Sequence, residues 1–270
     1  MKLNIIVCVK SVLNNMVPGG DRNSAENMEL NPFDRPAIEM ALALIKEQTE
    51  GTLTVLSMGP KPATFGLYQA ISIGANRAIL ICDPALKESD TYITAKVLSR
   101  ALKRLQPFDI VLFGTRSADS DTGHVGPQTA QMLDIPFIGN IHSLTFNKKE
   151  SYQDGLKYWI AERKSDGYVE KFEVEAHQTG VSFSVSSAFG ESDFTSLHGI
   201  ESAFTNKEIE IWDNLSLGLL PEETGVIASP TKIVAWNREK RVKRCLFIEG
   251  TPEQKAEQVA KHLSEAGFVG

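Results

Sequence analysis

The strongest constraint on the fold is a fourfold alternation of short apolar runs with longer helical patterns in the first half of the chain. The runs are rich in β-branched residues, and each is followed by a segment with helical periodicity. The predicted strands are Leu3–Val9, Thr52–Ser57, Arg77–Ile81 and Asp109–Phe113. The predicted helices are Asp34–Thr49, Lys61–Ile73, Ser89–Leu105 and Gly126–Leu133. This repeat predicts an α/β fold, an open parallel sheet with right-handed crossovers and helices on both faces.

Local signals at the helix ends agree with this architecture. Asp34 and Ser89 stand at the positions of N-caps, where a side-chain oxygen accepts an unpaired backbone N–H. Pro36, Pro62 and Pro127 fall in first turns, where a missing N–H does no harm. The sequence therefore predicts where these helices begin.

From Ile141 the periodicity changes. Lys157–Glu162, Val169–Glu175 and Val181–Val185 alternate between apolar and polar residues, which predicts strands added antiparallel at one edge of the sheet. The chain after Ser186 is irregular up to a last helical pattern from Pro252 to Ala266. We therefore divide the chain into an α/β domain, residues 1–190, and a partner-recognition segment with a C-terminal arm, residues 191–270, that we expect to lie on another subunit.

Composition excludes several classes of protein. The 270 residues carry a net charge of −6 and a pI near 5.5, which argues against a binder of nucleic acid or of membrane surfaces. Cys8, Cys82 and Cys245 match no zinc, iron–sulfur or disulfide pattern, so a reducing, cytoplasmic setting is expected. No apolar run suits a signal peptide or a membrane span, and we expect the mature protein to start at Met1.

The segments that follow the predicted strands are polar or contain glycine. In a parallel sheet they meet at the carboxyl edge, which is where open α/β sheets bind ligands. They are Cys8–Lys10, Ser57–Pro60, Cys82–Pro84 and the segment that starts at Gly114, joined from the same side by Asn31–Asp34. A nucleotide-sized crevice is expected there.

The segment from Gly114 to Pro136 leads directly into a predicted helix, and it is the best candidate for a phosphate site. A helix N-terminus presents unpaired N–H groups and a partial positive charge, and Gly123 and Gly126 let the backbone approach a ligand. Asp119 and Asp121 would repel a phosphate, so we interpret them as loop supports that accept backbone N–H bonds. The glycine patterns of ordinary dinucleotide-binding and P-loop proteins do not occur.

Several stretches, spread over nearly the whole chain, resemble those of one known protein family. They are Val7–Lys10, Asn31-Pro32, Ser57–Pro60, Ile73–Ala78 and Gly114–Pro127. Together they are similar to the β subunit of electron transfer flavoproteins. The resemblance implies a Rossmann-like nucleotide-binding fold of the adenine nucleotide α-hydrolase type and an obligate α subunit. That partner carries most of the site for the electron-transferring FAD.

The loop separates two subtypes of this family. Conventional members hold AMP, whereas electron-bifurcating members hold a second FAD, and Asp119–Pro127 is similar to the bifurcating form. Ser120 and His124 depart from the usual Gly and Gln of that group. The stretches Glu208–Trp212 and Ser229–Ile233 resemble its longer C-terminal arm. The resemblance therefore implies FAD in the loop, with AMP as the alternative.

The resemblance also implies roles for residues and partners. The chain would be an electron carrier, redox-active only as the heterodimer, with NADH as candidate donor, an acyl-CoA dehydrogenase-type acceptor, and ferredoxin or flavodoxin as candidate further partner. No residue is a proton-transfer catalyst. The nucleotide contacts would be Cys8, Lys10, Asn31, Met58, Gly59, Gly114, Thr122, Gly123, His124, Val125 and Thr129. Partner docking would use Phe194, Leu197 and Ile200. A stress-type nucleotide-binding homodimer is the alternative from another class.

Overall fold

The computed structural model describes residues 2–14, 24–48, 50–148, 157–176, 180–190, 195–206, 208–235 and 245–268. Its centre is a seven-stranded sheet in which every pairing is parallel. The strands, in spatial order, are β12 (Glu210–Trp212), β5 (Arg77–Ile81), β4 (Gly51–Met58), β1 (Leu3–Cys8), β6 (Ile110–Gly114), β11 (Val181–Val185) and β7 (Phe137–Ile141). The predicted parallel α/β fold is confirmed.

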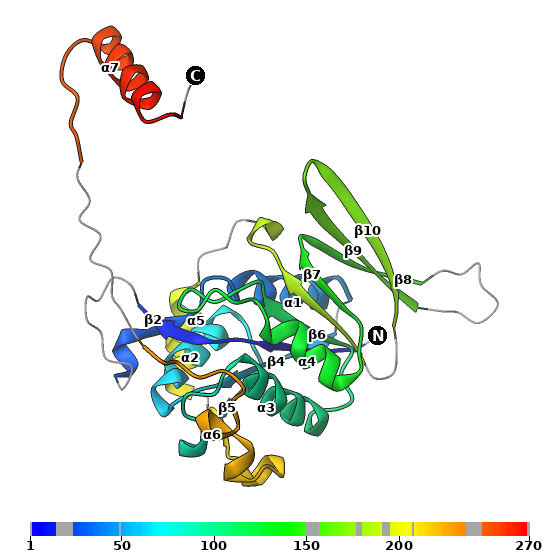
Figure 1. Cartoon of the computed structure of the whole chain (residues 1–270). Helices are drawn as coiled ribbons and strands as arrows, with labels where there is room; N and C mark the ends of the chain where they lie inside the picture. Colours follow the sequence, from blue (N-terminus) through cyan, green and yellow to red (C-terminus); the bar gives the residue numbers. More distant parts are fainter. Residues whose placement is uncertain are drawn as a thin grey trace. The chain divides into compact units, whose positions relative to one another are not determined.

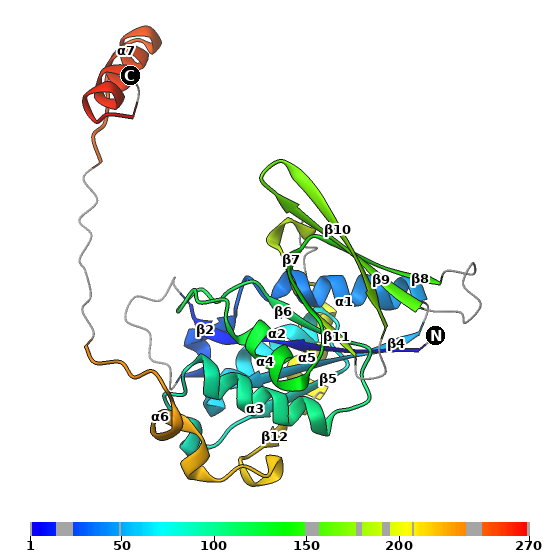
Figure 2. The ribbon, with the colours of Figure 1, turned by 45° about the vertical axis from the view of Figure 1, so that its right-hand side comes forward.

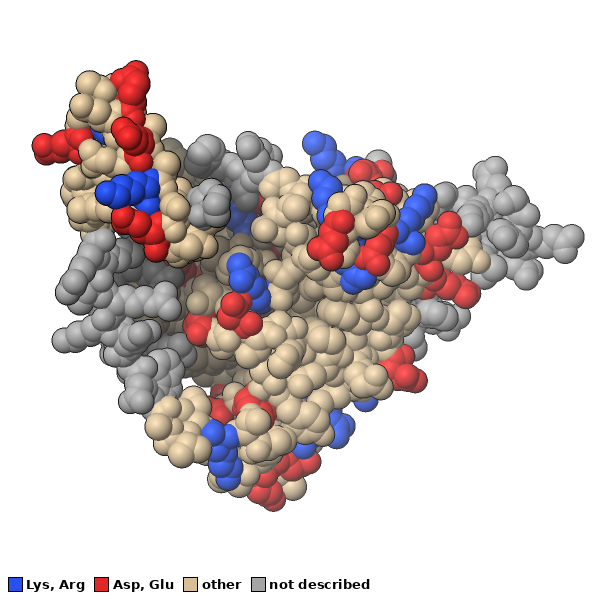
Figure 3. Space-filling model, turned by 45° about the horizontal axis from the view of Figure 1, so that its top comes forward, with Lys and Arg blue, Asp and Glu red and all other residues tan. Residues whose placement is uncertain are grey.

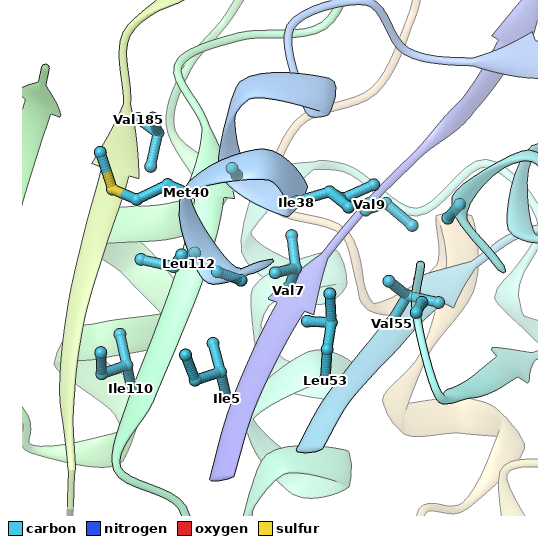
Figure 4. Close-up of a cluster of buried hydrophobic side chains, with 14 of the residues drawn as sticks. Ile5, Val7, Val9, Ile38, Met40, Leu53, Val55, Ile110, Leu112 and Val185 are labelled. Atoms are coloured by element: carbon cyan, nitrogen blue, oxygen red, sulfur yellow. The ribbon is translucent and has the colours of Figure 1, made fainter. Parts of the chain in front are cut away.

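Helices cover both faces of this sheet (Figures 1 and 2). They are α1 (Arg35–Gln48), α2 (Thr64–Ile73), α3 (Thr91–Arg104) and α4 (Val125–Leu133). Because both faces are covered, β1 is buried along almost its whole length, and its side chains alternate between two cores. Ile5 and Val7 lie under α1, in the cluster drawn in Figure 4, whereas Ile6 packs with residues of α3.

The predicted antiparallel strands form a separate small sheet. In it β8 (Ser143–Lys148), β9 (Lys157–Ser165) and β10 (Tyr168–Glu175) pair antiparallel in the order β10-β9-β8. Trp159 anchors this sheet to the main core, where it is buried against Phe146 with 4.7 Å between ring centroids. A further short pair joins β2 (Ser11–Leu13) and β3 (Met28–Leu30) antiparallel.

The prediction was wrong for one of these strands. Val181–Val185 was expected at an antiparallel edge, but β11 lies inside the main sheet, parallel to both β6 and β7. Its alternating serines are buried because they bond to the neighbouring strand region: Ser182 Oγ donates to the Pro136 carbonyl at 2.7 Å, and Ser184 Oγ accepts from Asn140 N at 2.8 Å. Serine hydroxyls that find hydrogen-bond partners can be buried, so a fully buried strand can show the alternation of apolar and polar residues that is typical of a half-exposed strand.

The chain after β11 adds a layer of short elements at the edge of the main sheet formed by β5, the edge opposite β7. It contains α5 (Leu197–Asn206), the edge strand β12 and α6 (Gly225–Ala228), joined by the 3₁₀ turns Leu215–Leu217 and Pro221–Glu223. Trp212 and Leu219 are buried against the α3 side of the sheet. Residues 1–232 form one compact unit, so the predicted boundary at residue 190 does not coincide with this division.

A partly buried polar network, which we call the edge network, fixes this layer. It consists of Asp83, Asp90, Asn214, Thr224 and Ser229. Asp83 accepts from the N–H groups of Ala85 and Asn214, and Asn214 Nδ2 donates to Thr224 Oγ1 at 2.9 Å. Asp90 caps α3 through Ile93 N at 2.9 Å and also accepts from Thr231 N and Oγ1. Asp90, and not the predicted Ser89, is therefore the N-cap, because the Ser89 hydroxyl donates back to the Leu86 carbonyl.

The second compact unit, residues 233–270, contains α7 (Pro252–Glu265). Thr251 and Gln254 form a capping box at its start, which explains why the helix begins at Pro252. Val259 and Leu263 lie on one face of α7 and are exposed. Across the part of the chain that the structure describes, no helix combines the length and apolar character needed to cross a membrane.

Candidate nucleotide-binding site

The order of the strands defines where a ligand would bind. The chain continues from β1 to β4 and β5 on one side, and then returns to β6 on the other side of β1. At such a switch point the loops leave in opposite directions and open a crevice at the carboxyl ends of the strands. The segments that follow β1 and β6 meet there, as predicted.

Asn31 joins these segments. Its side chain is 1% exposed and fully used: Oδ1 accepts from Ala118 N at 3.1 Å, and Nδ2 donates to the Arg116 carbonyl and to Asp34 Oδ1, both at 2.9 Å. Its backbone N–H donates to the Lys10 carbonyl at 2.8 Å. Asn31 therefore connects the end of β1 to the loop after β6.

Asp34 is the second buried polar residue here, 5% exposed. Its Oδ2 accepts from Lys10 N at 2.7 Å and its Oδ1 from Asn31 Nδ2. The prediction that Asp34 caps α1 was wrong, because both oxygens face the β1 end and Asn31. Burial raises the pKa of Asp34 to about 7, although these hydrogen bonds and the Lys10 charge act in the opposite direction.

Two ion pairs brace the loop between β6 and α4. Lys10 Nζ lies 2.7 Å from Asp119 Oδ1, and Arg116 lies 3.2 Å from Asp121 Oδ1. The Arg116 guanidinium also stacks over the Phe33 ring at 4.3 Å. Both aspartates thus pair with side-chain cations that support the loop, whereas backbone N–H donors were predicted. We call Lys10, Asn31, Asp34, Arg116, Asp119 and Asp121 the loop network.

The tip of the loop is open. Thr122, Gly123 and His124 are exposed, and Val125 is half-buried at the first position of α4. Gly123 has φ +64°, and a Cβ there would lie 2.9 Å from the Thr115 carbonyl oxygen, so only glycine fits without strain. The first N–H groups of α4 have no partner inside the helix and carry its partial positive charge. This tip is suited to an anionic group.

The other predicted contacts lie behind or beside the tip. Cys8 is buried, and burial raises the pKa of its thiol, so it is not a nucleophile. Thr129 is fully buried, and its hydroxyl donates to the Val125 carbonyl at 2.7 Å. Met58 and Gly59 are half-buried at the end of β4, and Gly59 N donates to the Ile81 carbonyl at 3.0 Å. Cys8 and Thr129 therefore support the site from inside.

Sequence reasoning missed three members of this constellation. Phe33, Asp34 and Arg116 were not predicted as site residues, although they hold the loop. The signal was the Asn-Pro-Phe-Asp run directly before α1, in which only Asn31 was predicted to contact the nucleotide. A carboxylate before a helix suggests a cap, and nothing local shows that its partners lie on another segment.

Two of the three predicted partner-docking residues lie on α5. Leu197 is 86% exposed at the start of α5, and Ile200 is exposed one turn later. Phe204 holds the helix by packing against Phe65 and Tyr68 of α2. Phe194 lies outside the described residues. An exposed aliphatic side chain on a supported helix is thus present at Leu197.

Charges of both signs lie close together on one face of the molecule. On the described part of the face in Figure 3, Lys and Arg side chains lie interspersed with Asp and Glu side chains. The two ion pairs of the loop network follow the same pattern. The helix terminus is therefore a distinct source of positive potential at the site.

A parallel α/β sheet with a glycine-bearing loop and a helix N-terminus at its switch point defines the class of nucleotide-binding α/β folds. A family model described as electron transfer flavoprotein domain matches residues 23–189. The chain is 33% identical over 240 residues to the electron transfer flavoprotein subunit beta of Thermoanaerobacterium thermosaccharolyticum, which covers 89% of this chain and 87% of that protein. The chain belongs to the electron transfer flavoprotein family, as a β subunit.

Two further relatives carry more specific names. The caffeyl-CoA reductase-Etf complex subunit CarD of Acetobacterium woodii is 32% identical over 205 residues, covering 76% of this chain and 73% of that protein. The acryloyl-CoA reductase electron transfer subunit gamma of Anaerotignum propionicum is 28% identical over 284 residues, covering 99% of this chain and all of that protein. β subunits of this family work with an α subunit and redox enzymes, and their chemistry involves flavin.

Proposed function

We propose that this chain is the β subunit of a two-flavin electron transfer flavoprotein that binds FAD at the loop tip and passes electrons from NADH through the FAD of the α subunit. The observation that carries the proposal is the open tip, where Gly123 brings bare backbone to the N-terminus of α4. A pyrophosphate is the anion that such a surface accepts best, because it spans several N–H groups.

The residues of the tip fit this ligand. Because Lys10 and Arg116 are each paired with an aspartate, their ammonium and guanidinium groups brace the loop, and the backbone N–H groups of Val125 and Gly126 are left to bind the phosphates. Thr122 offers an exposed hydroxyl beside them. Within the described chain, Gln128 Oε1 in the first turn of α4 is a buried acceptor without a hydrogen-bond partner. A ribose or ribityl hydroxyl would satisfy it.

A bound flavin supplies two-electron chemistry with a nicotinamide and one-electron chemistry with a second flavin. The chain's own contribution is to position the nucleotide. Val125 and Gly126 orient the phosphates, Asn31 and Asp34 fix the loop that presents them, and the buried Cys8 and Thr129 keep the floor of the site rigid. No side chain is assigned a proton transfer.

We further propose that the acceptor is an acyl-CoA dehydrogenase-type enzyme. The names of two relatives point to acyl-CoA reductases, and this supports the proposal by similarity. Leu197 and Ile200, exposed on α5, are the proposed docking side chains. The arm, residues 233–270, is proposed to bind the α subunit through the apolar face of α7 that carries Val259 and Leu263.

The test is a count of nucleotides in the heterodimer purified after co-expression with its α subunit. We expect Gly123→Val to lose the FAD of the loop, because a branched side chain closes the tip, and to keep the FAD of the α subunit. Gly218→Val is the matched control, since Gly218 has the same φ of +64° and would meet no atom within 4 Å. Two FAD per heterodimer in Gly123→Val would overturn the loop assignment.

A further inference from the structure

We propose that Asp34 is a positioning residue for the nucleotide loop: its carboxylate fixes the loop in the conformation that presents the α4 N-terminus, and loss of the negative charge releases it. This inference rests on the proposed function and adds to it a residue and a pH dependence. Asp34 touches no part of the open tip, so it acts through Asn31 and the backbone.

The hydrogen bonds give the route. Asp34 holds the end of β1 through Lys10 N at 2.7 Å and holds Asn31 Nδ2 at 2.9 Å. Asn31 in turn binds the Arg116 carbonyl and Ala118 N, which are both in the loop. The orientation of the Asn31 amide therefore depends on the carboxylate, and two loop contacts depend on that orientation.

A steric contact reinforces this route. Asp34 Oδ1 occupies the space where a Cβ on Gly114 would stand, so the carboxylate lies directly against the last residue of β6, from which the loop starts. The backbone of Phe33 borders the same space. A shift of Asp34 would thus displace the start of the loop as well as its middle.

The charged and titratable groups around Asp34 leave its charge poorly compensated. Lys10 is the nearest cation, but its ammonium pairs with Asp119, and the Cys8 thiol adds no charge. On the loop side, Arg116 stacks on Phe33 and pairs with Asp121. Since burial raises the pKa of Asp34 to about 7, the carboxylate is ionised at pH 8 and protonated at pH 6.

Protonation changes what the side chain accepts. The ionised group offers an acceptor oxygen to each of its two N–H donors, whereas the neutral acid turns one oxygen into a donor. One of Lys10 N and Asn31 Nδ2 then loses its partner. An asparagine at this position has the same defect at every pH, so Asp34→Asn imitates the protonated state.

The experiment measures FAD and AMP retained by the heterodimer after desalting at pH 6 to 8.5. We expect the affinity of the wild-type loop site for its nucleotide to fall about tenfold from pH 8 to pH 6, the equivalent of one lost hydrogen bond. Asp34→Asn should show the low affinity at pH 8 and no pH dependence. Asp109→Asn is the matched control, because Asp109 also accepts a backbone N–H, from Asn4 at 2.7 Å, beyond the opposite end of β6.

The outcomes separate two failures. A wild-type heterodimer that retains neither FAD nor AMP at the loop at pH 8 overturns the proposed function. A wild type that retains nucleotide while Asp34→Asn retains it equally overturns the role of Asp34 alone. If Asp34→Asn does not fold, the wild-type profile decides, since retention that is flat from pH 6 to 8.5 contradicts the proposal. Thermal melting of the variant at pH 8 completes the test, because a purely structural role predicts a lower Tm and a positioning role does not.

Discussion

The loop network and the edge network both contain aspartates and an asparagine, yet the pKa of Asp34 is raised whereas that of Asp90 is lowered. Asp90 of the edge network accepts three hydrogen bonds, from Ile93 N and from Thr231 N and Oγ1. Although burial raises its pKa, these bonds together hold it below the ordinary value. Asp34 of the loop network accepts two bonds, is more deeply buried, and has its pKa raised to about 7.

This difference teaches how structural and functional polar networks can be told apart. A carboxylate with enough donors is stabilised as an anion and strengthens the fold. A carboxylate buried with too few donors weakens the fold while ionised, so another role must explain its presence. The loop network also lies beside the exposed tip of Thr122, Gly123 and His124, whereas Asn214, Thr224 and Ser229 of the edge network are buried. The predictions below test this contrast, from the largest expected effect to the smallest.

The largest effect is expected at Gly225, which starts α6 and has φ +64°. A Cβ there would overlap the Ala85 carbonyl oxygen, so Gly225→Ala should lower the free energy of unfolding by about 3 kcal/mol, measured by urea denaturation. Gly218→Ala has the same φ without the contact and should lose only about 1 kcal/mol. Equal losses for the two variants would mean that the backbone around Gly225 shifts to make room for the added methyl group.

Asp90→Ala comes next, because it removes an N-cap and both bonds to Thr231. The expected loss is about 2 kcal/mol in urea denaturation. The control is Asp213→Ala, an exposed carboxylate that accepts from Ser216 N at 2.8 Å, with a much smaller expected loss because solvent competes for this bond. A loss at Asp90 no greater than at Asp213 would contradict the structural role of the edge network.

The pH dependence of stability should differ in sign between the two networks. The pKa of Asp34 is raised in the folded state, so its stabilising contribution is present at low pH and is lost as the pH rises through about 7. Just below that pH, the free energy of unfolding should fall by up to about 1.4 kcal/mol per pH unit. The lowered pKa of Asp90 makes its contribution disappear only in acid, as the pH falls through the folded-state value. Chemical denaturation between pH 6 and 8 should show the slope in wild type and a smaller one in Asp34→Asn; identical slopes would contradict this assignment.

The smallest effect is expected for the exposed pair of Arg77 and Glu210, which joins β5 to the edge strand β12. Solvent screens this pair, so a double-mutant cycle with alanine should give a coupling of about 0.5 kcal/mol that decreases at high salt. A coupling several times larger would show that β12 depends on the ion pair rather than on the buried Trp212.

The sequence predicted those features that depend on local pattern. Strands covered on both faces are apolar runs, so the parallel sheet could be recognised from β1, and glycine before a helix identified the tip at Gly123. Features that depend on distant partners could not be predicted. The serines of β11 bond to residues around β7, and Asp34 bonds to Lys10, 24 positions away, so both were assigned to the wrong local role.

The most direct test of the account is the nucleotide content of the wild-type heterodimer, purified after co-expression and extracted for quantitative chromatography. The account predicts two FAD and no AMP per heterodimer. One FAD and one AMP would contradict the two-flavin assignment, and one FAD without AMP would contradict the central claim that the α4 N-terminus holds a nucleotide.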